Sequence, residues 1–315
     1  MTLTEILRFV AENAFAVAPW FFLSIGLGVT VRALRLADGM RAALDRRPIP
    51  AILAAVAIGA FAPFCSCTVV PVVAGLLTAG VPLAPVMSFW VASPTMDPEI
   101  FTFTVSMLGW ELAVTRLVAS LVLATAAGFG IHALSKRGRF GSPLRPSLAG
   151  PSCSTDTCST DARGGTTMVR ETIATRLARL DLRSLGAEIG RESWSLGRWL
   201  LAAFALEALI IAYIPQEAIA GVLGGENVLS VPLAALVGVP LYVSNFTAMP
   251  IVSGLLGQGM SSGAAIAFLL AGPVTTVPAM VAVKPLVHRE VFVYYLAVGL
   301  LGATVLGMAT SAILG

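Results

Sequence analysis

The sequence predicts an all-α polytopic membrane protein made of two inverted-topology repeats, each with about five hydrophobic segments and with broken or re-entrant helices at its core. The first observation is composition: of 315 residues, 57% are hydrophobic and only 12% are charged, against roughly 25% charged in soluble domains. The second is a set of apolar runs long enough to cross a bilayer, about 20 residues each. These runs lie at 14–31, 112–131, 196–214 and 291–314.

The third observation is an internal repeat. The string "GAFAPFCSCTVVPVVAGLLTAG" from Gly59 aligns with "GVPLYVSNFTAMPIVSGLLGQG" from Gly238 at one constant offset (250 − 71 = 179). Because glycine and proline fix backbone geometry, their coincidence indicates one architecture in both halves, a construction common in transporters. The coinciding pairs are Gly59/Gly238, Thr68/Thr247, Pro71/Pro250, Gly75/Gly254 and Gly80/Gly259.

The charges of equivalent loops differ between the halves. Residues 32–47 carry five arginines, whereas their counterpart at 215–228 has two glutamates and no Lys or Arg. Further along the bias reverses, because 107–110 is uncharged and its counterpart near 284–289 is basic. Positive loops face the cytoplasm, so the repeats are predicted to be inverted. We expect an inner-membrane, multi-pass protein with both termini outside.

The segments follow in order along the chain. They are expected at 14–34, 48–62, 67–80, 83–108 and 111–135, then at 196–215, 229–245, 247–259, 262–285 and 289–314. The second and third of each half are short for full spans, so spanning and re-entrant forms both stay open. The domains predicted are a first membrane repeat (1–135), a cytoplasmic linker (136–193) and a second membrane repeat (194–315). The linker ends in an amphipathic or solvated helix.

Polar interruptions occur in matched pairs, "PFCSC" with "LYVSNFT" and "SPTMDP" with "GPVTTVP". Irregular backbone at membrane depth is tolerated only where it is buried in protein or lines a cavity. The interruptions therefore predict a substrate site, although prolines that only kink helices are the alternative. The predicted substrate-binding residues are Cys65, Ser66, Cys67, Thr68, Thr95, Asp97, Ser244, Asn245, Thr247, Thr275 and Thr276.

Sulfur ligands are the most distinctive part of this set. Cys65 and Cys67, with Met96 or Met249, could offer soft donors suited to copper(I), zinc or trivalent arsenic-like species. The alternative is that these cysteines are buried small hydrophobes. A second pair of candidate metal ligands, Cys153 and Cys158, lies in the linker, where idle thiols are an equal explanation.

Asp97 is an ionisable residue within a predicted span, which suggests a functional site. It is also placed to be an N-cap, with Pro98 at the first helical position, and the two roles are compatible. Glu207, Glu111 and Arg116 are weaker candidates, which we expect to be structural.

The motifs "PFCSC", "FWVASPTMDPEIF" and "GVPLYVSN" resemble those of the ArsP-like bacterial permeases. The resemblance covers nearly all of both halves. It implies transport, because some members export trivalent organoarsenicals and a related branch is linked to copper or zinc efflux. Cys65-Ser66-Cys67-Thr68 stands where members commonly have CSCG, and Ser244 where many of the metal-efflux branch have a cysteine. "SPTMDPEI" is similar to the general permease branch.

The functional prediction is a permease that exports a small thiophilic or metal-containing solute by alternating access, and not an enzyme. No nucleotide-binding P-loop motif occurs in the sequence, and no cofactor or nucleic-acid partner is expected. The expected partners are the lipid bilayer and a small-molecule or metal-ion substrate, with homo-oligomers left open. The alternatives are a membrane thiol oxidoreductase using Cys65 and Cys67, and a passive channel.

Overall fold

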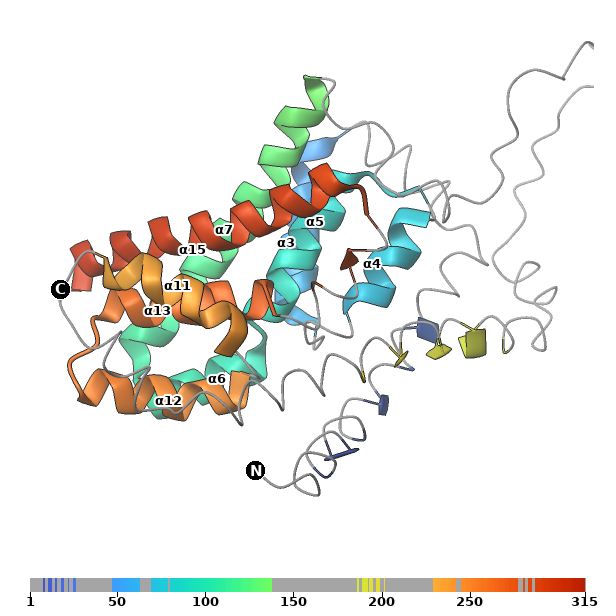
Figure 1. Cartoon of the computed structure of the whole chain (residues 1–315). Helices are drawn as coiled ribbons and strands as arrows, with labels where there is room; N and C mark the ends of the chain where they lie inside the picture. Colours follow the sequence, from blue (N-terminus) through green and yellow to red (C-terminus); the bar gives the residue numbers. More distant parts are fainter. Residues whose placement is uncertain are drawn as a thin grey trace, which may run out of the picture.

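The computed structural model describes most of the two predicted repeats. The described residues are 47–62, 69–78, 80–137, 229–241, 245–276, 280, 283–284 and 287–314, with single positions within 8–26 and 186–201. Every regular element labelled within these ranges is an α-helix (Figure 1). The prediction of an all-α protein is therefore confirmed.

The first half contributes five described helices. They are α3 (Pro48–Phe61), α4 (Val69–Thr78), α5 (Leu83–Thr95), α6 (Pro98–Leu108) and α7 (Trp110–Lys136). A proline at the start of both α3 and α6 fits the first helical turn, where no backbone donor is needed. The predicted segment 83–108 is thus divided into two helices, α5 and α6.

The second half contributes four described helices, which are α11 (Ser230–Leu241), α12 (Asn245–Gly257), α13 (Ser262–Val274) and α15 (Arg289–Leu314). Their bounds correspond to those of the first half. Helices α5 and α13 both have 13 residues, and both their starts and their ends are separated by the offset of 179 found in the sequence. Helices α7 and α15 begin at the same offset, and each has a glutamate in its first turn, Glu111 and Glu290.

Equivalent turns have equivalent backbones. After α4, Gly80 has φ 86°, and after α12, Gly259 has φ 95°. In both turns the glycine N–H donates to the carbonyl three residues earlier, and the next N–H donates to the carbonyl five residues earlier, at 3.0–3.1 Å. This is the Schellman end of a helix, which favours glycine because a Cβ is strained at positive φ.

Helix packing follows the same correspondence. Helix α5 lies between α3 and α7, and α13 lies between α11 and α15. On α7, a Cβ at Gly128 would stand 3.1 Å from the carbonyl oxygen of Ala84; on α15, a Cβ at Gly307 would stand 2.7 Å from that of Gly263. Both glycines therefore let a long helix approach the backbone of its central neighbour closely.

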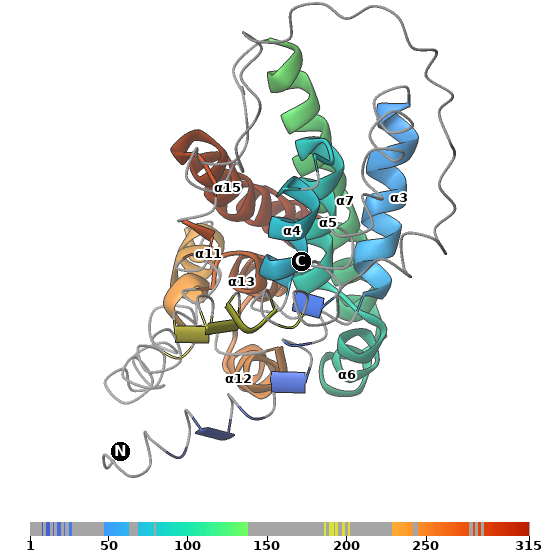
Figure 2. The same cartoon turned by 90° about the vertical axis from the view of Figure 1, so that its right-hand side faces the viewer.

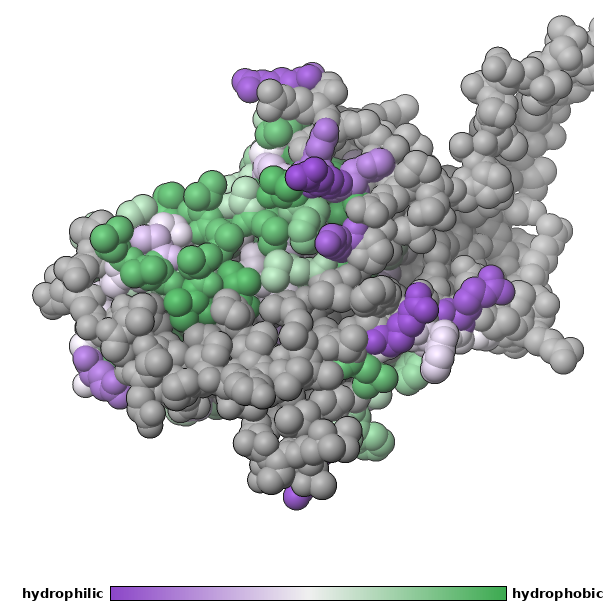
Figure 3. Space-filling model, viewed as in Figure 1, coloured by the Kyte–Doolittle hydropathy of each residue, from purple (hydrophilic) through white to green (hydrophobic). Residues whose placement is uncertain are grey.

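The outer surface of the described helices is apolar. Helices α7 and α15 are long and apolar enough to cross a membrane by length and composition. Hydrophobic residues gather over α15 and α11 in Figure 3, with hydrophilic residues toward the margins. The exposed apolar side chains on these two helices include Leu233, Leu236, Val293, Leu301 and Val305. Such a surface fits contact with lipid better than with water.

The two halves pack against each other at their junction, and each contributes residues to the core of the other. Helix α6 of the first half packs against α12 of the second, and the two lie on the same side of the molecule in Figures 1 and 2. Met96 and Ile100 belong to the hydrophobic core built mainly by the second half. Conversely, Val274 and Tyr295 belong to the core built mainly by the first half. The breaks after α5 and α13 therefore lie where one core meets the other.

Candidate functional site

The first break separates α5 from α6. Helix α5 ends at Thr95, and α6 begins at Pro98. Between them Met96 and Asp97 are extended, with φ/ψ of −157°/124° and −132°/169°. Pro98 explains the extended residue before it, because proline excludes the helical region for its predecessor. The motif "SPTMDP" thus spans the end of α5 and the start of α6.

The second break follows α13. That helix ends at Val274, and the N–H of Thr275 still donates to the carbonyl of Ala271 at 3.0 Å. Thr275 and Thr276 are both buried. The hydroxyl of Thr275 donates to the Ala271 carbonyl at 2.7 Å. At the first break the buried Thr95 hydroxyl likewise donates to the carbonyl of Val91 at 3.0 Å. A threonine hydroxyl therefore donates to a backbone carbonyl in the last turn of the helix at both breaks.

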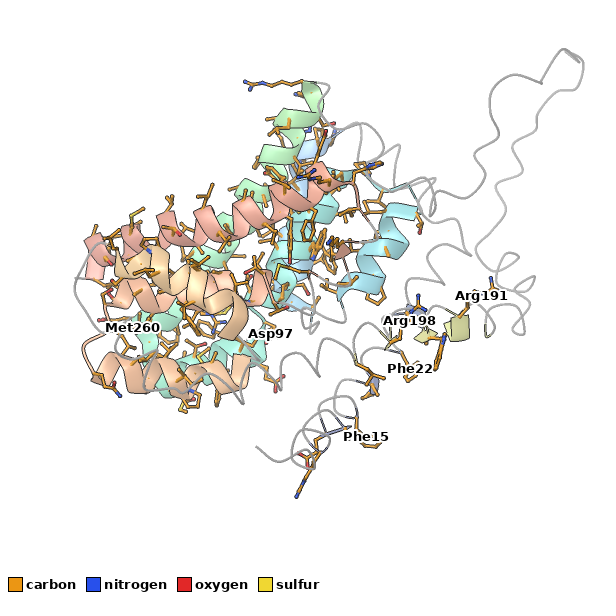
Figure 4. All side chains as sticks on the ribbon, in the orientation of Figure 1. Phe15, Phe22, Asp97, Arg191, Arg198 and Met260 are labelled. Atoms are coloured by element: carbon orange, nitrogen blue, oxygen red, sulfur yellow. The ribbon has the colours of Figure 1, made fainter. Side chains whose placement is uncertain are left out.

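Asp97 is the N-cap of α6. Its Oδ1 accepts a hydrogen bond from the N–H of Ile100 at 2.7 Å, and Pro98 occupies the first helical position. The capping role predicted for Asp97 is confirmed. The side chain is half-buried at the N-terminal end of α6 (Figure 4).

Arg116 lies on α7, and from the sequence we expected it to be structural. It is fully buried, and it is the one charged side chain buried among the described residues. Its Nη1 donates to Oγ1 of Thr104 in α6 at 3.1 Å. The same nitrogen lies 3.8 Å from Sδ of Met249 in α12. Arg116 thus touches both halves of the molecule.

A signal for Arg116 was present in the sequence. It is the only Lys or Arg between Arg47 and Lys136. A permanent charge inside a long apolar stretch faces a bundle interior or a cavity and marks a functional position. The contacts of Arg116 include Thr104 of α6 and Met249 of α12.

The equivalent position in the second half is Tyr295, which is also buried and also crosses to the other half. Its ring stacks on Trp90 of α5, with centroids 4.4 Å apart and planes 19° from parallel. Its hydroxyl donates to the carbonyl of Val274, the last residue of α13. Positions 116 and 295 therefore join the halves with different chemistry, a cation in one case and an aromatic ring in the other.

The remaining predicted site residues divide between α12 and the part of the chain outside the described residues. Asn245 and Thr247 belong to α12. The others lie outside the described residues: Cys65, Ser66, Cys67, Thr68, Ser244, Cys153 and Cys158. Among the residues that are described, no three His, Cys, Asp or Glu side chains come together as a metal site. The described junction instead offers a guanidinium, threonine hydroxyls and the thioethers of Met96 and Met249.

The described part of the chain is all-helical, with an apolar outer surface and polar breaks and a buried charge at the junction of two matched halves. That combination is typical of helical membrane permeases. The model of the ArsP_1 family, described as predicted permeases, matches residues 2–312. The chain belongs to this family, and it is a membrane permease; the resemblance inferred from the sequence motifs is confirmed.

The chain is also similar to two UPF0718 proteins from other organisms. The UPF0718 protein MJ0584 of Methanocaldococcus jannaschii is 21% identical over 293 residues, covering 81% of this chain and 80% of the relative. The UPF0718 protein YraQ of Escherichia coli K12 is 37% identical over 59 residues, covering 19% of this chain and 17% of the relative. No solved structure matches the chain.

Proposed function

We propose that this permease is a secondary transporter that exports a small thiophilic or metal-containing solute, such as an organoarsenical or a soft metal, by alternating access between two inverted repeats. One observation carries the proposal: the breaks after α5 and α13 occur at equivalent positions and at the junction of the two cores. Transport sites of repeat-built carriers usually form at such discontinuous helices.

The topology that we propose follows from the loop charges. The repeats occupy 1–135 and 194–315, the linker 136–193 is cytoplasmic, and both termini are outside the inner membrane. Alternating access then consists of rocking one half against the other around a central site. Among the contacts that cross between the halves, the stack of Trp90 on Tyr295 is one that this motion must change.

The soft character of the solute is supported by sulfur at the junction. Met96 and Met249 are both buried in the same core, one beside the first break and the other on α12. Thioethers bind soft species, and Cys65 and Cys67 are proposed to supply thiolates to the same solute. Asp97 is proposed to carry a proton or bind a cation during transport. Cys153 and Cys158 are proposed to collect the solute on the cytoplasmic side.

The test is uptake into everted membrane vesicles that contain the full chain. Methylarsenite, arsenite, copper(I), zinc and cadmium are offered in turn, with and without a proton gradient. The proposal predicts gradient-dependent accumulation of at least one, weakened by Cys65→Ser and Asp97→Asn. Thr102→Val, which alters an exposed hydroxyl outside the proposed site, is the control and should retain transport.

Other outcomes distinguish the alternatives. Flux that ignores the gradient and only equalises concentrations would indicate a channel. Thiol oxidation that is abolished by either Cys65→Ser or Cys67→Ser, without solute accumulation, would indicate an oxidoreductase. Accumulation that is unchanged by Cys65→Ser would contradict the soft-ligand proposal.

A further inference from the structure

A chain of hydrogen bonds connects the first break to the second half. Oδ1 of Asp97 accepts from the N–H of Ile100 at 2.7 Å, and the Ile100 carbonyl accepts from Oγ1 of Thr104 at 2.6 Å. The Thr104 oxygen also accepts from Nη1 of Arg116 at 3.1 Å, and it lies 3.9 Å from Sδ of Met249. That same Nη1 reaches Sδ of Met249 in α12. The chain runs along two turns of α6.

Both ends of α6 are suited to act as hinges. Before the helix, Met96 and Asp97 are extended. After it, Gly109 has φ 87° and ψ 170° and leads directly into α7 at Trp110. A Cβ on Gly109 would meet nothing within 4 Å. Glycine is therefore favoured here by the positive φ angle and not by steric crowding. A few residues at element ends that absorb backbone rotation are how rigid elements pivot.

We propose that Arg116 is a positioning residue for transport, which ties α6 of the first half to α12 of the second so that the two helices move together. This inference rests on the proposed function, because only a transporter with moving halves needs such a tie. Burying a charge is costly, and in some proteins a buried ionic group holds a defined arrangement of the elements around it. The guanidinium supplies one group that contacts both helices at once.

The contact geometry accounts for the choice of arginine. The planar guanidinium presents several donors in a fixed fork, so it can address Thr104 on one helix and Met249 on another. A lysine keeps the charge with a single rotating ammonium and is expected to restore part of the coupling. A leucine fills a similar volume and removes the contacts with Thr104 and Met249.

The experiment combines two readouts on the full chain in lipid bilayers. Hydrogen–deuterium exchange measures the opening of α6 and α12 without any solute. Methylarsenite uptake gives the maximal rate and KM separately. The variants are Arg116→Leu, Arg116→Lys, Thr104→Val, Met249→Leu and the double variant Arg116→Leu with Met249→Leu. The matched control is Thr102→Val, because the Thr102 hydroxyl also bonds within α6 but is exposed.

The inference predicts that Arg116→Leu speeds exchange in α6 and α12 together and leaves α3 unchanged. It also predicts that the maximal uptake rate falls by about tenfold, which lies within the fold-changes typical of coupling between sites. KM should change by less than about twofold. Thr104→Val should act in the same direction, Arg116→Lys should recover part of the rate, and Thr102→Val should resemble the wild type. Met249→Leu should add little in the Arg116→Leu background, because both variants break one contact chain.

Three results would overturn the inference. One is faster exchange in α6 with α12 unchanged. Another is a raised KM with an unchanged maximal rate, which would make Arg116 a solute-binding residue. The third is strict additivity of Arg116→Leu and Met249→Leu. If the wild type takes up no methylarsenite, that cargo is wrong, and the exchange data alone decide whether Arg116 couples the helices.

Discussion

The two halves of the molecule share their backbone framework and differ where they touch each other. Helices α5 and α13, the glycine turns at Gly80 and Gly259, and the close approaches of α7 and α15 recur at one sequence offset. At the equivalent positions 116 and 295, by contrast, an arginine reaches Met249 and a tyrosine reaches Trp90. The backbone framework thus depends on the same residue types in both halves, whereas the side chains that cross the junction differ between the halves.

The strongest test of this difference places arginine in the tyrosine position. The equivalent of Thr104 is Val283, which has no hydroxyl, so an arginine at 295 would be buried without the oxygen that Arg116 uses. We expect Tyr295→Arg to destabilise the fold by about 3–5 kcal/mol, the cost of an uncompensated buried charge. The measurement is the thermal unfolding midpoint in detergent, with Tyr295→Phe as control, expected to lose about 1 kcal/mol for one hydrogen bond. A midpoint for Tyr295→Arg equal to that of Tyr295→Phe would contradict the account.

The next largest effect concerns the close helix approaches. Gly307→Ala should cost about 1–3 kcal/mol, because its Cβ would press on the carbonyl oxygen of Gly263 at 2.7 Å. Gly128→Ala should behave alike in the first half. Gly254→Ala is the matched control, since nothing lies within 4 Å of its Cβ, and it should stabilise α12 by up to ~1 kcal/mol. The comparison of the halves fails if Gly128→Ala behaves like Gly254→Ala, as judged by thermal unfolding.

The turn glycines should give smaller and equal effects. Gly80→Ala and Gly259→Ala each place a Cβ at positive φ, which costs roughly 1–2 kcal/mol. Asparagine tolerates this conformation better, so Gly80→Asn and Gly259→Asn should each cost less than the alanine variants. Unfolding midpoints of the four variants provide the measurement. Unequal losses in the two halves would show that the turns are not equivalent.

The smallest effect separates capping from charge at Asp97. Asp97→Ala removes the acceptor of the Ile100 N–H and should cost about 1 kcal/mol, whereas Asp97→Asn keeps an N-cap and should cost only a few tenths. Uptake measured on the same two variants gives the second readout. If the carboxylate serves transport, both variants should show reduced uptake, although their stabilities differ. Normal uptake by Asp97→Asn would reduce Asp97 to a cap.

The sequence predicted the framework better than the junction. Segments such as 48–62 and 111–135 correspond to α3 and α7, because apolar runs and Gly or Pro punctuation are local signals. The N-cap at Asp97 was readable from Pro98 for the same reason. The contacts of Arg116 with Thr104 and Met249 could not be predicted, because tertiary packing brings these residues together. The pairing of Trp90 with Tyr295 has no local signal, since 205 residues separate them (295 − 90 = 205).

Side-specific labelling distinguishes two halves that are inverted across the membrane from two that are parallel. Glu111 and Glu290 occupy the same place in α7 and α15, and both are exposed. Glu111→Cys and Glu290→Cys are made separately in a chain whose four native cysteines are replaced by serine. Each is then labelled with a membrane-impermeant maleimide in spheroplasts and in everted vesicles. The account predicts that position 111 reacts only from outside and position 290 only from the cytoplasmic side, whereas labelling of both from one side would contradict it.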